Sequence, residues 1–253
     1  MLDRFRLDGR TALVTGASRG LGSAMARALA EAGAEVAVHA SQPLSPQTTR
    51  ELISTVGERA HVLSADLSQK DAAEQLAQDA LRSLGRIDIL VNNAGIIRRA
   101  DAESYPDEDW DDVLMVDLSS VFRLCRTIGR TMLERGSGKI INIASMLTFQ
   151  GGLRVPAYAA AKGGVAQLTK ALANEWAGRG VNVNAIAPGY MRTDNTQALR
   201  DDRPRYDAIT ARIPAGRWGE PDDLAGAVVF LASSASDYVH GYVLAVDGGW
   251  LAR

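Results

Sequence analysis

The feature that most constrains this chain is a short apolar run that leads directly into a glycine-rich turn and an amphipathic helical pattern. Residues 11–15 form the run, Gly16, Gly20 and Gly22 punctuate the turn, and apolar residues recur at helical spacing over 21–29. A short continuous apolar run predicts a strand buried on both faces. Glycines let the backbone approach a pyrophosphate closely, and the following helix offers free N–H groups. The sequence predicts a dinucleotide-binding turn; a turn of the same shape without a ligand is the alternative.

The same alternation of strand and helix patterns continues to the end of the chain. Further strands are predicted at 35–40, 61–65, 87–91, 139–144, 181–187 and 242–246. Helical patterns lie between them, at 46–56, 69–84, 107–135, 156–177 and 222–232. A polar, arginine-rich stretch up to residue 217 follows Pro188-Gly189 and has no assigned element. This repetition predicts a parallel sheet with helices on both faces. We expect one doubly wound α/β Rossmann domain over residues 1–253.

Composition excludes several classes of function. Among 253 residues there is a single cysteine, Cys125, and only three histidines, so we expect no disulfide framework and no metal site. Cys125 itself is expected to be a small buried residue. Lys plus Arg number 28 against 30 Asp plus Glu, which gives no indication of a nucleic-acid partner. No apolar stretch approaches the ~18 residues of a membrane span, and the charged N-terminus does not resemble a signal peptide. We therefore expect a soluble, cytoplasmic protein that binds no membrane.

Three polar residues form a candidate catalytic group. Tyr158 and Lys162 are four residues apart in a predicted helix, so both project from one face. A tyrosine of ordinary pKa ~10 is a poor base at neutral pH, but a nearby cation favours its phenolate. Ser145 follows a predicted strand, at the edge where open α/β sheets bind ligands. The pattern predicts Tyr158 as general acid and base, with Ser145 orienting an oxygen. A half-buried tyrosine beside a solvated lysine is the alternative.

Four ordered motifs together resemble the short-chain dehydrogenase/reductase family. They are the Gly16-x3-Gly20-x-Gly22 turn, Asn92-Asn93-Ala94-Gly95, the Ser145, Tyr158 and Lys162 group, and Pro188-Gly189. The resemblance covers the whole chain and implies hydride transfer between a nicotinamide and an alcohol or carbonyl carbon. It implies that Tyr158 exchanges the proton, that Ser145 orients the oxygen, and that Lys162 holds the nicotinamide ribose and depresses the pKa of Tyr158. Asp117 stands where many members have a fourth catalytic residue, an asparagine.

The resemblance also implies the residues that contact the cofactor. Asp66 and Leu67 match a pair that contacts adenine, although Asp66 could equally cap the next helix. Thr193 matches a residue near the nicotinamide carboxamide. The complete set of expected cofactor contacts is Gly16, Ser18, Arg19, Gly20, Leu21, Gly22, Ser41, Asp66, Leu67, Asn93, Gly95, Tyr158, Lys162, Pro188, Gly189 and Thr193.

Two features favour NADP over NAD. NAD sites usually place an acidic residue at the end of the second strand, where it holds the ribose 2′-OH. This chain has His39-Ala40-Ser41 there and no acid. Arg19 lies within the glycine turn, where a guanidinium can meet a 2′-phosphate. An arginine of the solvated loop is the alternative interpretation of Arg19.

Within the family, several segments are similar to a group that acts on 2-deoxy- or 2-keto-3-deoxy-gluconate. Arg99 and Arg154 are candidate contacts for a sugar-acid carboxylate, and Gln150 and Asn195 are candidate contacts for its hydroxyls. A surface or interface role is the alternative for each arginine. The resemblance also implies a homotetramer. Competing hypotheses are an NADPH-dependent β-ketoacyl carrier-protein reductase and a non-catalytic dinucleotide-sensing regulator.

Overall fold

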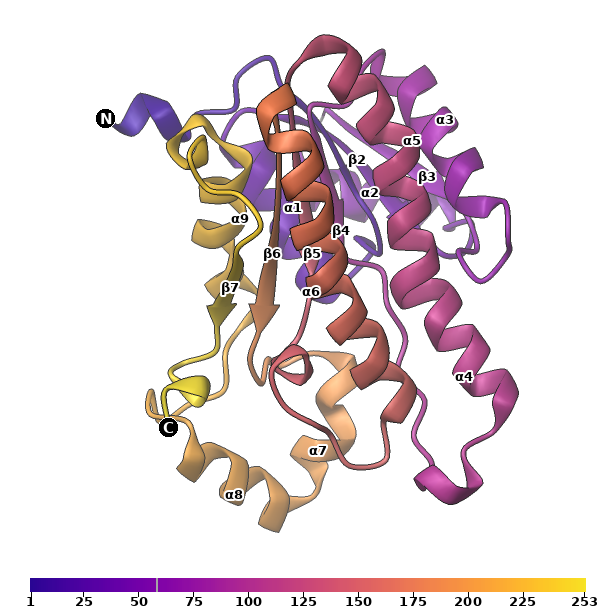
Figure 1. Cartoon of the computed structure of the whole chain (residues 1–253), viewed down its shortest axis with the longest axis vertical. Coiled ribbons are helices and arrows are strands. Elements are labelled where there is room, and N and C mark those ends of the chain that lie inside the picture. The colour runs from indigo at the N-terminus through magenta and orange to yellow at the C-terminus, as the bar shows by residue number, and fades with distance from the viewer. Residues whose placement is uncertain (58) are drawn as a thin grey trace.

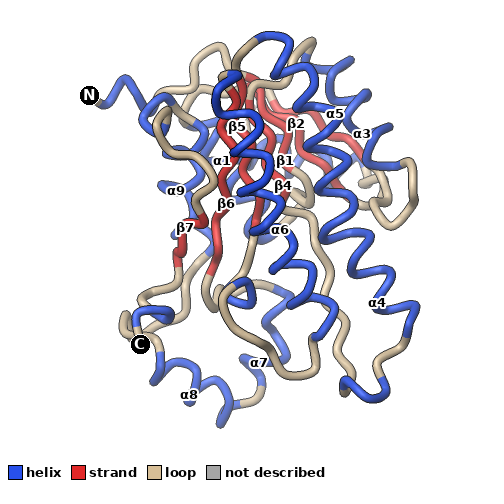
Figure 2. The backbone as a smooth tube through the Cα atoms, viewed as in Figure 1, coloured by secondary structure: helices blue, strands red, loops and turns tan. Residues whose placement is uncertain are grey.

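The computed structural model describes residues 1–57 and 59–253 and contains a sheet of seven strands between two layers of helices (Figure 1). The strands are β1 Thr11–Val14, β2 Glu35–Ala40, β3 Ala60–Ser64, β4 Ile89–Asn92, β5 Gly138–Ile143, β6 Val181–Pro188 and β7 Val243–Val246. Each neighbouring pair is parallel, in the order β3-β2-β1-β4-β5-β6-β7 (Figure 2). The predicted doubly wound α/β fold is confirmed.

Helices cover both faces of the sheet because its strands are apolar on both sides. One face is covered by α1 Gly20–Glu31, α2 Pro46–Val56 and α9 Ala225–Ala232. The other is covered by α3 Ala72–Leu84, α5 Ser120–Arg135 and α6 Pro156–Trp176, with α4 Asp107–Leu114 preceding α5. On β1, Val14 packs against the first layer and Leu13 against the second, and both are fully buried. Burial of each such side chain stabilises the fold by about 1.5–3 kcal/mol.

Two segments differ from the sequence prediction. The unassigned arginine-rich stretch contains two helices, α7 Gln197–Asp201 and α8 Arg203–Arg212, which lie beyond the carboxyl ends of the strands near the C-terminus (Figure 1). The expected single helix over 107–135 consists of α4 and α5 joined by a π-helical turn, Met115–Ser119. The smaller differences are at the ends of elements: α3 begins at Ala72, a 3-10 turn, Pro221–Leu224, precedes α9, and the strand predicted at 87–91 is β4 at Ile89–Asn92.

A buried chain of polar side chains links β4, β5 and α6. The Asn92 amide donates to Asn142 Oδ1 at 2.8 Å, and the Asn142 amide donates to Thr169 Oγ1 at 2.9 Å. Thr169 in turn donates to the Val165 carbonyl of its own helix. Cys125 is fully buried beside this chain, as predicted, and its burial raises the pKa of the thiol to about 12. These bonds fix the helix that carries Tyr158 and Lys162 against the centre of the sheet.

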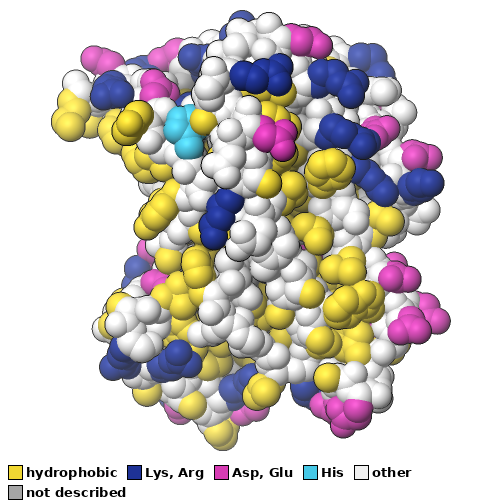
Figure 3. Space-filling model, in the orientation of Figure 1, with side chains coloured by type: hydrophobic (Ala, Val, Ile, Leu, Met, Phe, Trp, Pro, Cys, Tyr) yellow, Lys and Arg dark blue, Asp and Glu magenta, His cyan; other side chains and the backbone are white. Residues whose placement is uncertain are grey.

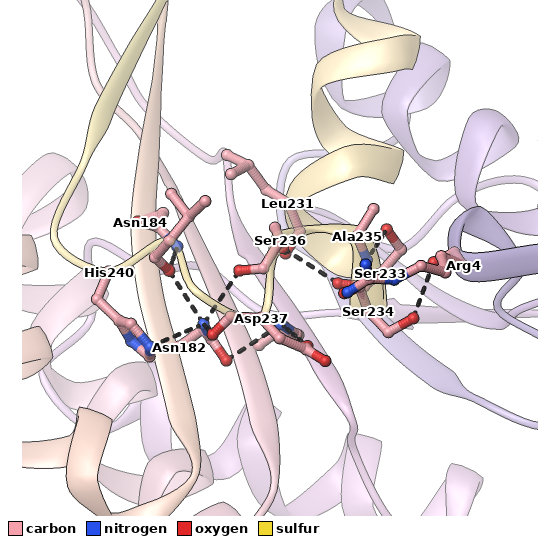
Figure 4. Close-up of polar contacts among 12 residues, drawn as sticks. Arg4, Asn182, Asn184, Leu231, Ser233, Ser234, Ala235, Ser236, Asp237 and His240 are labelled. Atoms are coloured by element: carbon pink, nitrogen blue, oxygen red, sulfur yellow. Dashed lines mark hydrogen bonds and ion pairs between the residues drawn. The ribbon is translucent and has the colours of Figure 1, made fainter. Parts of the chain in front are cut away.

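A second polar network holds the C-terminal segment against the opposite end of β6 (Figure 4). The Asn182 amide donates to the carbonyls of Asp237 and Val239, and the Asn184 amide also donates to Val239. Nearby, Ser234 exchanges hydrogen bonds with Arg4 near the N-terminus. Asn184 also accepts from the Tyr242 N–H, which aligns β7 with β6. These hydrogen bonds therefore hold the C-terminal segment and β7 against β6.

Among the described residues, no helix combines the length and the apolar character needed to cross a bilayer.

Candidate active site

The site lies where the strand order reverses between β1 and β4. The carboxyl ends of these strands, and of β5 and β6, meet at one edge of the sheet. Each strand there leads into a segment with a predicted function: Gly16 after β1, Asn93 after β4, Ser145 after β5 and Gly189 after β6. Open α/β sheets bind ligands in the crevice formed at such a reversal.

Two glycines of the turn, Gly16 and Gly22, are packed too tightly to be replaced by a residue with a side chain. Gly16 has a φ of +61°, and a Cβ there would lie 2.8 Å from Ala94 Cα. A Cβ on Gly22 would lie 2.3 Å from the Gly16 carbonyl oxygen. The Asn93 amide braces the turn by donating to the carbonyls of Thr15 and Gly16 at 2.9 and 3.0 Å. The first N–H groups of α1, which begins at Gly20, have no partners within the helix. A backbone surface with free N–H groups at a helix N-terminus fits the pyrophosphate of a dinucleotide.

His39 also holds this turn, and the sequence analysis did not assign it that function. Its side chain is buried, with Nδ1 3.1 Å from the Gly16 N–H and Nε2 2.8 Å from the Ala65 carbonyl. Burial lowers the pKa of His39 below its ordinary value. In the sequence, the only indication of this contact was a histidine at the end of the second predicted strand.

Ser145, Tyr158 and Lys162 lie together beside the turn, as the sequence predicts. Tyr158 is half-buried, and the Lys162 ammonium is 5.4 Å from the centre of its ring. Lys162 is buried in the first half of α6 and donates to the Ile143 carbonyl at 2.9 Å. The Ser145 hydroxyl oxygen accepts from the Leu147 N–H at 3.2 Å, so its proton can be donated, and its hydrogen bond with Tyr158 lowers the pKa of that residue.

Asp117 completes the group from the π-helical turn between α4 and α5. Its Oδ1 accepts from the Ile96 N–H at 2.8 Å, and its Oδ2 lies 3.3 Å from Lys162 Nζ. A Cβ on Gly95 would lie only 2.7 Å from this carboxylate, so the backbone after β4 and the carboxylate are in close contact. A π-helical turn re-aims the side chains of a helix, and such turns are frequent at functional sites.

The charges of these groups act on one another. Burial raises the pKa of Tyr158, the Lys162 cation lowers it, and the Asp117 carboxylate raises it again. The net pKa of Tyr158 lies above its ordinary value, so the lowering expected from Lys162 is present but outweighed. Burial also raises the pKa of Asp117. Burial lowers the pKa of Lys162, but the charges of Asp117 and Tyr158 outweigh it and raise the pKa.

Of the residues expected around the adenosine, Ser41 follows β2, Asp66 and Leu67 follow β3, and Arg19 lies in the glycine turn. Arg19 precedes α1 and forms an exposed ion pair with Asp194 at 3.4 Å. Such exposed pairs stabilise by only about 0–1 kcal/mol, so Arg19 can exchange Asp194 for another anion. Ser41 is exposed and Leu67 is buried. The Asp66 carboxylate accepts from the N–H and hydroxyl of Ser68, which lowers its pKa, and it does not cap α3.

The segment after β6 faces the glycine turn. The position of a Cβ on Gly20 would be 3.9 Å from the Thr193 methyl group. Gly189 packs directly on Asp247, where a Cβ would lie 2.6 Å from the Asp247 Cα. Arg200 of α7 donates to the Thr193 carbonyl at 3.1 Å and so ties α7 to this segment. Arg200 was missed from the sequence because nothing there indicated a helix.

The four candidate substrate contacts differ in their surroundings. The Arg99 guanidinium donates to the Asn195 carbonyl at 3.3 Å, and its charge lowers the pKa of Tyr158. Arg154 instead forms an ion pair with Asp101 at 3.0 Å and has a left-handed φ of +64°. Gln150 accepts from the Trp250 indole N–H at 3.2 Å, which ties the C-terminal segment to the loop after β5.

Trp218 and Trp250 are packing residues. Both are buried, and Tyr190 contacts each ring edge-on. The distance between ring centres is 5.3 Å to Trp218 and 4.7 Å to Trp250. Among the residues that the structure describes, there is no group of three or more His, Cys, Asp or Glu side chains that could hold a metal ion.

A Rossmann sheet with a tight glycine turn and a Ser, Tyr and Lys group at its carboxyl edge defines a nicotinamide-dependent oxidoreductase. The chain belongs to the short-chain dehydrogenase/reductase family. Residues 16–251 match the protein family described as Enoyl-(Acyl carrier protein) reductase.

Several relatives match this chain over almost its whole length. The chain is 54% identical over 254 residues to the 2-dehydro-3-deoxy-D-gluconate 5-dehydrogenase of Dickeya dadantii, with 100% of each chain covered. A crystal structure of an Agrobacterium tumefaciens protein with bound NADP is 52% identical, has a TM-score of 0.90 and covers 99% of each chain. The gluconate 5-dehydrogenase of Burkholderia cenocepacia, in complex with NADP and tartrate, is 42% identical with a TM-score of 0.91 and covers 100% of this chain and 99% of that one.

Proposed function

We propose that the enzyme transfers a hydride between NADP(H) and a secondary alcohol or ketone of a sugar acid of the 2-deoxy- or 2-keto-3-deoxy-gluconate type. The observation that carries this proposal is the Arg99 guanidinium, which donates to the Asn195 carbonyl in the segment after β6 and whose charge lowers the pKa of Tyr158. A guanidinium in that place could bind the carboxylate of a sugar acid. The names of the Dickeya and Burkholderia relatives support the same substrate class.

The side chains supply the proton chemistry. The nicotinamide, when bound, accepts or supplies the hydride. Tyr158 takes the alcohol proton during oxidation and returns it during reduction. Ser145 donates its free proton to the substrate oxygen and so holds that oxygen near the phenol. The Lys162 cation stabilises the phenolate, and its bond to the Ile143 carbonyl keeps it in place. Asp117 keeps Lys162 charged.

The cofactor would be held along the edge from Ser41 to Thr193. The turn with Ser18, Leu21 and its glycines would bind the pyrophosphate, and Asp66 and Leu67 would contact adenine. Asn93, Gly95, Pro188, Gly189 and Thr193 would line the nicotinamide half. Arg19 would bind the 2′-phosphate in place of Asp194, which favours NADP over NAD. Structures of relatives with bound NADP support this preference.

The test follows nicotinamide absorbance with purified enzyme. NAD(H) and NADP(H) are each tried with deoxy- and keto-deoxy-gluconates, gluconate and one β-ketoacyl thioester. We expect the highest kcat/KM with a deoxy sugar acid and NADP(H). A higher kcat/KM with the thioester would favour the carrier-protein reductase, and a clear preference for NADH would refute the choice of cofactor.

We also propose that residues 1–253 form one domain that assembles into a cytoplasmic homotetramer. Hydrophobic side chains gather on the face that carries α4, α5 and α6 (Figure 3), and Trp110 and Phe122 are exposed there. Light scattering during gel filtration tests the assembly. A tetramer that is weakened by Phe122→Glu supports it, and a monomer at all concentrations contradicts it.

A further inference from the structure

His39 makes two hydrogen bonds that together determine its protonation. Nδ1 lies 3.1 Å from the Gly16 N–H, and Nε2 lies 2.8 Å from the Ala65 carbonyl. A backbone N–H can only donate and a carbonyl can only accept, so Nδ1 must accept and Nε2 must donate. The ring is therefore neutral and carries its proton on Nε2.

The same residue also holds the next amide of the turn. The Ala17 N–H donates to the His39 carbonyl at 2.8 Å, so two consecutive N–H groups of the turn bond to residue 39. On the other side, the Asn93 amide donates to the Gly16 carbonyl, and Ala94 leaves no room for a Cβ on Gly16. Gly16 is thus fixed from both sides, by β2 and by the segment after β4.

We propose that His39 is a positioning residue for the cofactor, because its neutral imidazole fixes the Gly16 amide and links the glycine turn to the end of β3. The inference rests on the proposed binding of a nicotinamide dinucleotide at this turn. His39 contacts no cofactor atom in this proposal and acts only through Gly16 and Ala17.

Protonation of His39 would break this arrangement. An imidazolium donates from both nitrogens, so its Nδ1–H would oppose the Gly16 N–H across 3.1 Å, and the turn would have to move. Burial disfavours that cation and lowers the pKa of His39 below 6.5, so the neutral bridge persists at neutral pH. Weakening is expected only as the pH falls below 6.5.

Within the part of the chain that the structure describes, burial and the hydrogen bond to the Ala65 carbonyl determine this pKa. Four charged side chains on the segments near His39 have partners elsewhere. Arg19 pairs with Asp194, Asp66 accepts from Ser68, Glu74 pairs with Arg126 and Asp79 pairs with Arg82.

Two substitutions of His39 test its hydrogen bonds to Gly16 and to Ala65 one at a time. In His39→Asn, the amide oxygen takes the place of Nδ1 and can still accept from Gly16, while the bond to Ala65 is lost. In His39→Gln, the longer amide can reach Ala65, while the acceptor for Gly16 is lost. We expect the Kd for NADPH at pH 7.5 to stay within about twofold for His39→Asn and to rise about tenfold for His39→Gln. His61→Gln is the matched control, because His61 bonds Glu35 and Ser83 and lies outside the turn.

The dependence of cofactor binding on pH is measured with NADH, because NADH lacks the 2′-phosphate of NADPH, which itself titrates. Across the pH range in which His39 titrates, which its NMR signals give, the Kd for NADH should rise as the pH falls in the wild type and in His61→Gln but stay flat in His39→Asn. Thermal unfolding verifies that each variant is folded. Equal pH dependence in wild type and His39→Asn, or wild-type affinity in His39→Gln, would overturn the proposal.

A readout without cofactor separates this proposal from the proposed function. With 15N-labelled histidine, the NMR signals of His39 should show the neutral ring with its proton on Nε2 at pH 7. A proton on Nδ1, or a charged ring, at that pH overturns the proposal whatever the enzyme binds. If the NMR result holds but the wild type binds neither nucleotide, both the proposed function and the positioning of a cofactor are refuted.

Discussion

The Asp117 carboxylate lies 3.3 Å from the Lys162 ammonium, and both side chains are buried. This pair places a negative charge behind the cation that faces Tyr158. Lys162 lowers the pKa of Tyr158 and Asp117 raises it, so the carboxylate partly cancels the effect of the lysine on the tyrosine.

Removing the Asp117 charge should therefore shift the pH dependence of the reaction. Asp117→Asn retains an oxygen for the Ile96 N–H but removes the charge that raises the pKa of Tyr158. We expect the pH–rate profile for alcohol oxidation to move to lower pH, because the phenolate forms more readily. Asp112→Asn, an exposed position of α4, is the control and should leave the profile unchanged. A shift of Asp117→Asn to higher pH would contradict this electrostatic account.

Tyr158→Phe removes the only atom proposed to exchange the proton. General acid–base catalysis contributes about 10²–10⁴-fold, so kcat should fall by at least about 10²-fold. The Kd for NADPH, measured by fluorescence, should change little because the ring remains. Tyr242→Phe alters an exposed tyrosine and should keep wild-type kcat. Retained turnover in Tyr158→Phe would exclude the proposed role.

Arg99 and Arg98 are adjacent but differ in their partners. Arg98 forms an ion pair with Asp109, whereas Arg99 donates to the Asn195 carbonyl and acts on Tyr158. Charged hydrogen bonds contribute about 1.5–3 kcal/mol, so Arg99→Ala should raise KM for a sugar acid by roughly 10- to 100-fold. Arg98→Ala should change KM by much less. Steady-state kinetics with the acid and with its uncharged lactone or alcohol analogue distinguish carboxylate binding from a general defect, which would affect both substrates.

Substitutions of Gly22 in the glycine turn and of Gly226 in α9 together test how tightly the turn is packed. A Cβ on Gly22 would lie 2.3 Å from the Gly16 carbonyl oxygen, whereas a Cβ on Gly226 has no neighbour within 4 Å. Gly22→Ala should lower the free energy of unfolding by about 1–3 kcal/mol and weaken NADPH binding. Gly226→Ala should raise that free energy by about 0.4–1 kcal/mol and leave binding unchanged. Calorimetry measures both effects; equal stability of the two variants would show that the turn is not tightly packed.

The layout of the fold could be predicted from sequence because each element carries its own pattern. β2 and α2 have the predicted bounds, and Ser45 caps α2 by accepting from Thr48. α7 and α8 were missed because α8 buries only Ile209 and therefore shows no apolar stripe.

The sequence allowed the residue types of the candidate site to be predicted, but not the partners of each side chain. Ser145, Tyr158 and Lys162 do lie together, but their pairings depend on segments distant in sequence. Arg154 is paired with Asp101, a partner that spacing does not reveal. The bond of His39 to Gly16 likewise arises only when β1 and β2 are neighbours.

The polar chain from Asn92 through Asn142 to Thr169 has a consequence for how this enzyme can change over evolutionary time. Each member satisfies its neighbour, so replacing one alone by an apolar residue leaves a buried donor or acceptor unpaired, at a cost of about 1–3 kcal/mol. Replacing interacting positions together avoids part of that cost, so their mutational effects are not additive. The three positions should therefore be inherited as a set, while the exposed loops around the substrate diversify one residue at a time.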